Sequence, residues 1–306
     1  MAVFVLRRLF SSLVVMFCVA SLTFLLARTM KGGPFDRDRP MPEHLKGELE
    51  AKYKLGGSLW QQYTSFVADL LRGDLRVSTK YRDWRVDELL AQKLPTSLGL
   101  GLAAFLLAAF GGVLAGAWAA MRRDTWIDFG AMFGALVAIS IPAFVVGPFL
   151  IAAFGIMLGW LPIGGWGHWK QVILPAVCLA APYVAYVARL MRNSLIEVLR
   201  SDFMRTAKAK GVGEWQALSR HAMKVAILPV VSFLGPLAAN LLTGSMVVES
   251  IFNIPGAGNI FVNAIQNRDV MLLVGAVIVY CGLLVFFNLL VDVVYTLLDK
   301  RIRLHG

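Results

Sequence analysis

Six apolar stretches constrain this chain more than any other feature of its sequence. Each is long enough to cross the hydrocarbon core of a bilayer, which takes about 20 residues of helix. With 58% hydrophobic and 16% charged residues, the chain is also far more apolar than a soluble domain. The sequence therefore predicts an all-α integral membrane protein. The stretches span residues 9–27, 98–120, 129–158, 172–190, 230–248 and 271–296.

Two of the stretches carry further signals. The third contains Pro142 and Pro148, and because proline removes a backbone donor, we expect this helix to be kinked or broken. The first follows Arg7 and Arg8 but is longer than the apolar region of a signal peptide. No clear small-residue cleavage site follows it, so we interpret it as an uncleaved first span.

The basic residues orient the chain. If the N-terminus is cytoplasmic, 15 of the 30 Lys and Arg residues lie on inside segments. Of the other 15, 13 lie in the long loop 28–93, and loops of that length do not obey the positive-inside rule. Without that loop, 15 basic residues lie on the inside segments and 2 on the outside segments, which predicts that both termini are cytoplasmic. Eight of the inside bases lie between residues 189 and 224, so the net charge of +11 orients the chain and is not a nucleic-acid footprint.

The long outer loop has the pattern of a small folded region, with a mobile loop as the alternative. Residues 42–55 predict a short polar helix. Residues 59–71 predict an amphipathic helix with Trp60, Tyr63, Phe66 or Val67, and Leu70 on one side. We divide the chain into an N-terminal span (1–27), an outer region (28–97) and a core (98–306) that includes the cytoplasmic loop 191–229.

The sequence carries none of the common catalytic or nucleotide-binding motifs. It has no HExxH, no GxxxxGK[ST] and no GxSxG, and its three cysteines lie in apolar runs without a CxxC. A carrier driven by protons or ions would show several embedded acids or histidines, whereas Asp292 is the one obvious embedded charge. Asp292 shares a helix face with Asn288, Tyr295 and Asp299, which is either a buried polar seam or part of a substrate path. Gly112 and Gly116 form a GxxxG that favours close helix packing.

The cytoplasmic segment 191–224 is too long for a simple connector. Leu195, Leu199, Phe203 and Ala207 recur every four residues and predict one amphipathic helix. A second stripe, formed by Trp215, Leu218, Ala222 and Val225, predicts another. Between them, Gly211 and Gly213 supply the backbone freedom of a sharp turn. From spacing alone the pair either lies on anionic lipid or projects to dock into a partner protein.

In this segment the stretch DFMRTAKAKG at 202–211 is followed by RHA at 220–222 and ILP at 227–229. This order of motifs resembles the cytoplasmic signature of ABC importer permeases. Arg205, Thr206 and Ala207 replace the general Glu-Ala-Ala, as in the peptide-importer branch. Asp202 lies three residues before Arg205 and is placed to pair with it. Matching pieces run along nearly the whole chain, and the closest similarity is to the first permease subunit, the B subunit, of bacterial oligopeptide importers; among the pieces are EAKYKL at 50–55, GDL at 73–75, IPAFVV at 141–146 and TGSMVVE at 243–249.

The resemblance implies a fold and a function. The fold is the type I ABC importer permease fold, with six transmembrane helices and a small helical periplasmic insertion after the first. The function is that of the non-catalytic translocation subunit of an ATP-driven oligopeptide importer in the bacterial inner membrane. Partners would be a second permease subunit, two ATPase subunits and a periplasmic or lipid-anchored binding protein. ATP and Mg would be bound by the ATPases, and this chain would hold no cofactor and no metal.

The resemblance also assigns roles to residues. A coupling helix would dock into an ATPase through Ser201, Asp202, Phe203, Arg205, Thr206, Ala207, Lys208, Lys210 and Gly211. An outer gate meeting the binding protein, or else a plain loop turn, would comprise Glu249, Asn253, Pro255, Gly256 and Gly258. Polar groups within the spans suggest a translocation path formed by Tyr183, Tyr186, Asn240, Asn288 and Asp292.

Alternatives remain at the level of the sequence. The same machinery could serve dipeptides, nickel or another small solute. A partner-independent channel or carrier, or a membrane-embedded enzyme, would be a different class of protein. Transport by the chain alone would favour the carrier, and clustered acids or histidines at the membrane surface would favour the enzyme.

Overall fold

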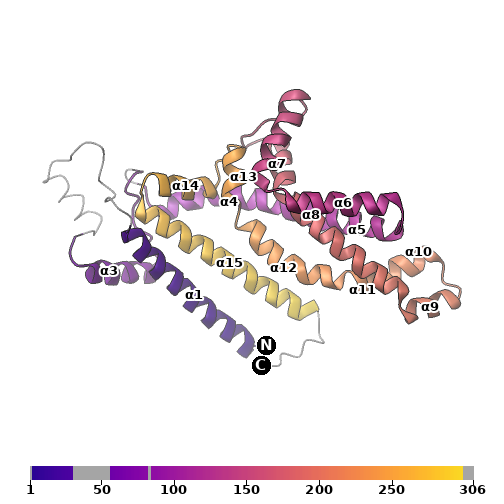
Figure 1. The fold of residues 1–306 in the computed structure, drawn as a ribbon. Coiled ribbons are helices and arrows are strands. Elements are labelled where there is room, and N and C mark those ends of the chain that lie inside the picture. Colours follow the sequence, from indigo (N-terminus) through magenta and orange to yellow (C-terminus); the bar gives the residue numbers. More distant parts are fainter. Residues whose placement is uncertain (1, 30–55, 82–83, 299–306) are drawn as a thin grey trace. The chain divides into compact units, whose positions relative to one another are not determined.

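The computed structural model describes residues 2–29, 56–81 and 84–298, which are mainly helical (Figure 1). The predicted helix 42–55 lies outside the described residues. The chain divides into two compact units, one formed by residues 1–97 and 255–289 and the other by residues 98–254 and 290–306. Each unit is described by itself.

The apolar stretches all form helices. Four are long and apolar enough to span a membrane, and two bent helix pairs raise the number to as many as six, among the described residues. The four helical regions are α1 (Ala2–Thr29), the continuous helix Val86–Met121, α8 (Trp169–Arg200) and α15 (Val270–Leu298). The Val86–Met121 helix comprises α4 (Val86–Leu106), a π-helical turn (Leu107–Gly111) and α5 (Gly112–Met121).

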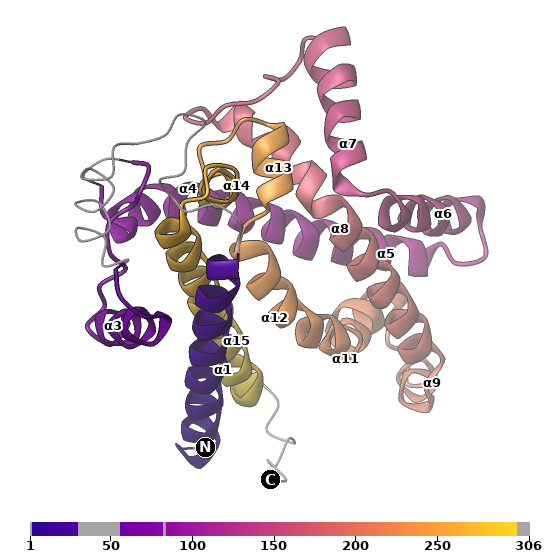
Figure 2. The ribbon, with the colours of Figure 1, turned by 60° about the vertical axis from the view of Figure 1, so that its left-hand side comes forward.

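The third predicted span is broken, as its prolines indicate. It consists of α6 (Trp126–Ser140) and a second arm, Ala143–Met157, in which α7 (Ala143–Leu150) continues as a π-helix. The two arms are bent by 109°. The break lies at Ile141 and Pro142, both in extended conformation, whereas Pro148 lies within α7 without ending it. Figure 2 shows α7 leaving α6 at a steep angle.

The fifth predicted span is shorter than expected. Helix α12 (Leu228–Leu242) ends before residue 248, and α13 (Met246–Ile251) follows as a separate helix. The break lies at Thr243–Ser245, where Gly244 has a φ of +88°, a conformation that favours glycine. The prediction of one span over 230–248 is therefore wrong at its C-terminal end, because the backbone angle of a glycine cannot be predicted from the apolar run around it.

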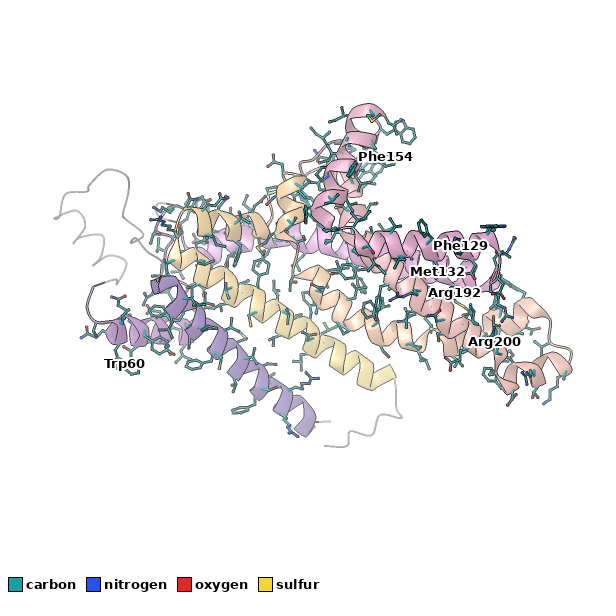
Figure 3. All side chains as sticks on the ribbon, viewed as in Figure 1. Trp60, Phe129, Met132, Phe154, Arg192 and Arg200 are labelled. Atoms are coloured by element: carbon teal, nitrogen blue, oxygen red, sulfur yellow. The ribbon has the colours of Figure 1, made fainter. Side chains whose placement is uncertain are left out.

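In the unit formed by residues 1–97 and 255–289, α1 lies beside α15, and α3 (Leu59–Leu71) packs against α1 (Figure 1). Ser58 caps α3 through a reciprocal pair of hydrogen bonds with Gln61, which confirms the predicted helix 59–71. Phe66 is buried and stacks on Phe24, with ring centroids 4.9 Å apart. Trp60, however, is 70% exposed (labelled in Figure 3), so the predicted apolar face is only partly buried.

A buried carboxylate fixes the segment after α3 in the same unit. Asp269 is 1% exposed and accepts hydrogen bonds from the Ser78 hydroxyl and from the backbone N–H groups of Thr79 and Lys80, the latter two at 3.2 Å. It also accepts from the Leu272 N–H at 3.1 Å, at the start of α15. Because a buried carboxylate needs several donors, this one side chain ties residues 78–80 to the first turn of α15. Helix α14 (Ala257–Gln266) completes the unit.

In the unit formed by residues 98–254 and 290–306, α8 is the central helix. Figure 1 and Figure 2 show α5 and α6 alongside it, and α8 packs against both. The buried face of α8 includes Val187, Met191 and Leu195. A Cβ at Gly112 would lie 2.5 Å from Val187 Cβ, and one at Gly116 would collide with the Ala188 carbonyl oxygen. The GxxxG therefore marks a close helix approach, as predicted.

We predict that Gly116→Val destabilises the protein, because the added side chain would meet the Ala188 carbonyl oxygen and Met191 Cβ. Overpacking of this kind costs about 1–3 kcal/mol. Thermal unfolding of the detergent-solubilised protein measures the effect. Gly130→Val, on α6, is the matched control, since nothing lies within 4 Å of its Cβ position. Equal melting temperatures for the two variants would contradict the close approach.

Candidate functional site

The first predicted cytoplasmic helix is two helices. Leu195 and Leu199 belong to α8, which ends at Arg200, and α9 (Asp202–Ala209) begins after a single extended residue, Ser201. The Ser201 hydroxyl donates to the Val198 carbonyl at 2.6 Å, and the Ser201 carbonyl accepts from the backbone N–H groups of Met204 and Arg205. The four-residue periodicity over 195–207 therefore does not describe one continuous helix. Ser201 joins the two helices directly.

Met204 anchors α9, and the sequence pattern missed it. Met204, which is not part of the predicted stripe, is fully buried, whereas Phe203, which belongs to the stripe, is 45% exposed. The break at Ser201 causes this difference, because it resets the helical phase and turns position 204 toward the core. Helix α9 consequently presents Phe203 outward together with the exposed Asp202 and Arg205, whose charged groups pair at 3.3 Å as expected.

Gly211 ends α9 in the predicted turn. Its φ is +80°, and the Val212 N–H donates to the Ala207 carbonyl at 3.2 Å across the turn. This is the hydrogen bond of a Schellman motif, in which glycine occupies the left-handed position and the next residue makes an apolar contact. Val212 packs against the core of its unit. The turn therefore has a fixed exit direction.

A π-helical turn shifts the second predicted stripe. The chain continues through α10 (Glu214–Gln216), a π-helix (Ala217–Ala222) and α11 (Met223–Ala226). Trp215 and Val225 are 72% and 42% exposed, while Ala217, Ala222 and Ala226 are buried. The spacing of 5 and then 4 between the buried residues fits a π turn, in which one extra residue changes the face that packs inward. The predicted stripe is therefore divided, with Trp215 and Val225 exposed and Ala222 buried.

Arginines surround a cavity beside α9. A cavity of about 730 Å³ is lined by the ends of α5 and α8, by α9 and by the start of the following helix. Arg123, Arg200 and Arg205 line it together with the buried Met204 (Arg200 is labelled in Figure 3). The wall of this cavity is therefore basic, and α9 contributes Arg205 and Met204 to it.

An ion pair joins α6 to α8, and sequence reasoning did not find it. Asp128 is 4% exposed and accepts from Arg192 Nε at 2.5 Å and from Arg192 Nη2 at 2.6 Å. It also accepts from the Asp124 N–H at 3.1 Å. Figure 3 labels Arg192 beside Phe129 and Met132, where α6 meets α8. A two-pronged guanidinium–carboxylate contact of this kind fixes geometry as well as charge.

Three of the predicted path residues come together between α8 and α12. Asn240 Nδ2 donates to Tyr183 Oη at 2.9 Å, and the Tyr186 ring lies 4.3 Å from the Phe233 ring. Asn288 is partly buried on α15, within the other unit. The side chain of Asp292 lies outside the described residues, as does that of Lys208 in α9.

The predicted outer gate residues differ in exposure. Asn253 and Pro255 are exposed, whereas Glu249, Gly256 and Gly258 are buried. Asn253 has a φ of +49°, and the Ile254 N–H donates to the Glu249 carbonyl at 2.8 Å, so the segment after α13 turns sharply. Of the five residues, Asn253 and Pro255 are therefore the ones whose side chains are open to contact a protein. Within the described residues, no group of three His, Cys, Asp or Glu is placed to hold a metal.

Comparison with known proteins gives consistent matches. A family model described as "Binding-protein-dependent transport system inner membrane component" matches residues 112–304. The chain is 43% identical over 302 residues to the oligopeptide transport system permease protein OppB of Escherichia coli K12, which covers 98% of this chain and 99% of that protein. It is 41% identical to OppB of Haemophilus influenzae with the same coverage. The dipeptide transport system permease protein DppB of Bacillus subtilis is 37% identical over 305 residues, 100% of this chain and 99% of that one.

Solved structures share the fold. An inward-facing form of the MetNI methionine ABC transporter matches with a TM-score of 0.57 and 14% identity, over 69% of this chain and 96% of that chain. An amino acid ABC transporter crystallised with histidines matches with a TM-score of 0.52 and 19% identity, over 68% and 94% of the two chains. At these identities the likeness concerns the fold, which is that of ABC importer permeases, as predicted.

We predict that Met204→Ala lowers the melting temperature of the protein, because it empties a fully buried site under α9. A large-to-small change in a core costs about 2–5 kcal/mol. Phe203→Ala, one position away, removes an exposed side chain and is expected to leave the melting temperature within a degree or two. If Phe203→Ala were the more destabilising change, the assignment of the anchor would be wrong.

Proposed function

This chain belongs to the family of inner-membrane components of binding-protein-dependent transport systems. From that premise we propose that it carries oligopeptides across the membrane as one subunit of an ATP-driven importer. As a permease subunit it is a non-catalytic translocation component. The names of its OppB relatives, at 41–43% identity over nearly full length, support a peptide as the substrate. DppB at 37% identity keeps dipeptides as the second candidate.

The observation that carries the proposal is the construction of α9. This short helix is anchored from below by Met204, ends in a fixed turn at Gly211, and presents Phe203 and Arg205 outward. A rigid amphipathic helix of this kind suits insertion into a groove on a partner protein. We assign that groove to an ATPase subunit, and we assign the contact to Ser201–Gly211. Lys208 and Lys210 add positive charge to the same segment.

Transport would follow from movement of this helix. ATP-driven closure of the two ATPase subunits would displace α9, and Ser201 would transmit the displacement to α8, to which it is joined without a linker. Because α8 packs tightly against α5 and α6, these helices would move together between inward-facing and outward-facing arrangements. ATP and Mg would be held by the ATPase subunits.

The proposed assembly contains a second permease subunit, two ATPase subunits and a periplasmic or lipid-anchored peptide-binding protein. Both termini and α9 would lie in the cytoplasm, in agreement with the distribution of basic residues. The outer region 28–97 and the turn at Asn253 and Pro255 would lie on the opposite side, where the binding protein delivers peptide. Peptide would pass along Tyr183, Tyr186 and Asn240, which lie within one unit.

Reconstitution tests the proposal. Proteoliposomes that contain both permeases and both ATPases should take up a labelled tripeptide when ATP is inside and the binding protein is outside. Omission of any one component should abolish uptake. Transport by this chain alone would refute the assignment, and uptake of dipeptides in strong preference to tripeptides would favour the second candidate.

We predict that Gly211→Val lowers ATP-driven peptide uptake severalfold while leaving peptide binding to the binding protein unchanged. A β-branched residue in the left-handed region costs about 1–2 kcal/mol and would redirect the turn that ends α9. Uptake rate and binding-protein affinity, measured on the same complex, separate the two effects.

Gly213→Val is the control for this experiment. Gly213 lies two residues away, its backbone is outside the left-handed region, and nothing lies within 4 Å of its Cβ position. Its uptake should stay near that of the wild type. Normal uptake and normal peptide-stimulated ATP hydrolysis by G211V would contradict the role of α9 in coupling.

A further inference from the structure

A polar stripe runs along the open side of α8. Tyr186, Arg189, Asn193 and Glu197 are exposed and follow one another at spacings of 3, 4 and 4, so they share one helix face. The opposite face is buried and apolar. A helix face in contact with hydrocarbon is apolar, and ionisable groups within spans mark substrate or ion pathways. Tyr186 lies within the predicted span 172–190 and Arg189 lies at its end, so this part of the stripe is suited to a water-filled path or a subunit boundary. Asn193 and Glu197 continue the face into the predicted cytoplasmic segment.

Two contacts place α12 beside this stripe. Asn240 donates to Tyr183, and the Phe233 ring lies against Tyr186. On α12, Asn240 and Pro236 are exposed on the same side as Phe233, three to seven residues along the helix. The open surface therefore continues from α8 onto α12 and combines aromatic rings, an amide and a guanidinium.

Arg189 is the distinctive group on this surface. Its guanidinium carbon lies 5.8 Å from the centroid of the Tyr186 ring, and among the described residues it has no carboxylate partner. Arg192, less than one turn further along, differs in that Asp128 engages it twice. The Arg189 guanidinium therefore lies over an aromatic ring, and no carboxylate of the described residues pairs with it, so it is available to bind a ligand.

The position of Arg189 along α8 fits the inner end of a path. Trp169 begins α8 and is exposed, as is typical of an aromatic residue at a membrane interface. Arg189 follows it by 20 residues, which corresponds to about 30 Å of helix, the thickness of a bilayer core. Arg189 therefore lies where a substrate that passes along Tyr183 and Tyr186 would leave the membrane.

We propose that Arg189 forms a carboxylate-binding subsite in the transport path and binds the C-terminal carboxylate of the peptide. A guanidinium presents a planar set of donors that matches a carboxylate with two hydrogen bonds, and the Tyr186 ring holds it in place. Every unmodified linear peptide carries this carboxylate, so the subsite recognises peptides of any sequence. This inference rests on the proposed function and adds a substrate contact to it.

The test compares a peptide acid with its amide. The complete complex in proteoliposomes is given labelled tri-alanine or tri-alanine amide, each at a concentration that saturates the binding protein, so that affinity for that protein does not enter. In Arg189→Gln the acid should be taken up about tenfold more slowly, as expected when a charged hydrogen-bonded contact is lost. Uptake of the amide should stay within about twofold of the wild type, because the amide never had that contact.

Two further variants sharpen the test. Arg189→Lys keeps the charge without the planar fork and should restore a substantial part of acid uptake. Arg122→Gln is the matched control, since Arg122 also lies over an aromatic ring, 5.7 Å from that of Trp118, but outside the stripe. It should transport the acid and the amide as the wild type does.

The outcomes separate the subsite from the proposed function. If the wild-type complex imports no peptide, the proposed function fails. If R189Q slows the acid and the amide equally, or no longer co-purifies with the second permease, Arg189 has another role and the subsite is overturned. If the wild type imports the acid but not the amide, the comparison of R189K with R189Q decides. Recovery of acid uptake in R189K supports the subsite, and an equal loss of acid uptake in both variants overturns it.

Discussion

The close approach of α5 and α8 is the constraint on which the rest of the second unit depends. At Gly112 and Gly116 the two helices are so near that no side chain fits between them. Lipid supplies no hydrophobic force that drives helices together, so backbone contact of this kind holds them by dispersion forces along their length. With α8 fixed in this way, its buried face is determined, and the opposite face remains for polar residues such as Arg189. Helix α9 inherits its position because Ser201 joins it to α8 without a linker.

An ion pair completes this arrangement where α6 begins. Asp128 and Arg192 hold the start of α6 against α8, and both are largely removed from solvent. Removing either partner would leave the other buried without compensation, so the pair specifies where α6 begins as much as it stabilises the contact. The neighbouring Arg189 lacks such a partner among the described residues, and that contrast separates a structural arginine from one available to a ligand.

The sequence predicted the helices, the broken third span, the close packing at Gly116 and the turn at Gly211, because each depends on local chemistry. Hydrophobic runs, prolines and glycines act through the backbone within a few residues. The structure departs from the periodic pattern where one residue changes the helical phase. Ser201 interrupts the apparent periodicity of 195–207 and makes Met204 the anchor in place of Phe203. A π turn moves Trp215 and Val225 outward. A search for apolar residues at 3.6 residues per turn assumes a regular α-helix, so it detects neither a helix break nor a π turn.

Other features depended on contacts between distant parts of the chain. Asp128 and Arg192 are 64 residues apart, and nothing in their local sequence indicates a pair. Glu249 reads as an exposed acid near an outer turn, yet it is fully buried. Asp269, next to the apolar run of α15, accepts hydrogen bonds from residues nearly 200 positions earlier in the chain. Burial of these acids follows from tertiary packing, which a pattern read along one sequence does not contain.

The length of α8 has a mechanical consequence. Its 32 residues form a rod of about 48 Å that ends directly in α9. A tilt of about 5° around the middle of such a rod would displace each end by about 2 Å, in opposite directions. A push on α9 would therefore move the far end of α8 in the opposite direction. The movement of the far end would be the larger one if the helix turns about the glycine contact at Val187 and Ala188, which lies nearer to α9 than the middle of α8. In the proposed mechanism α8 would act as a lever with its fulcrum at the contact with α5, where Gly112 and Gly116 bring the two helices close together.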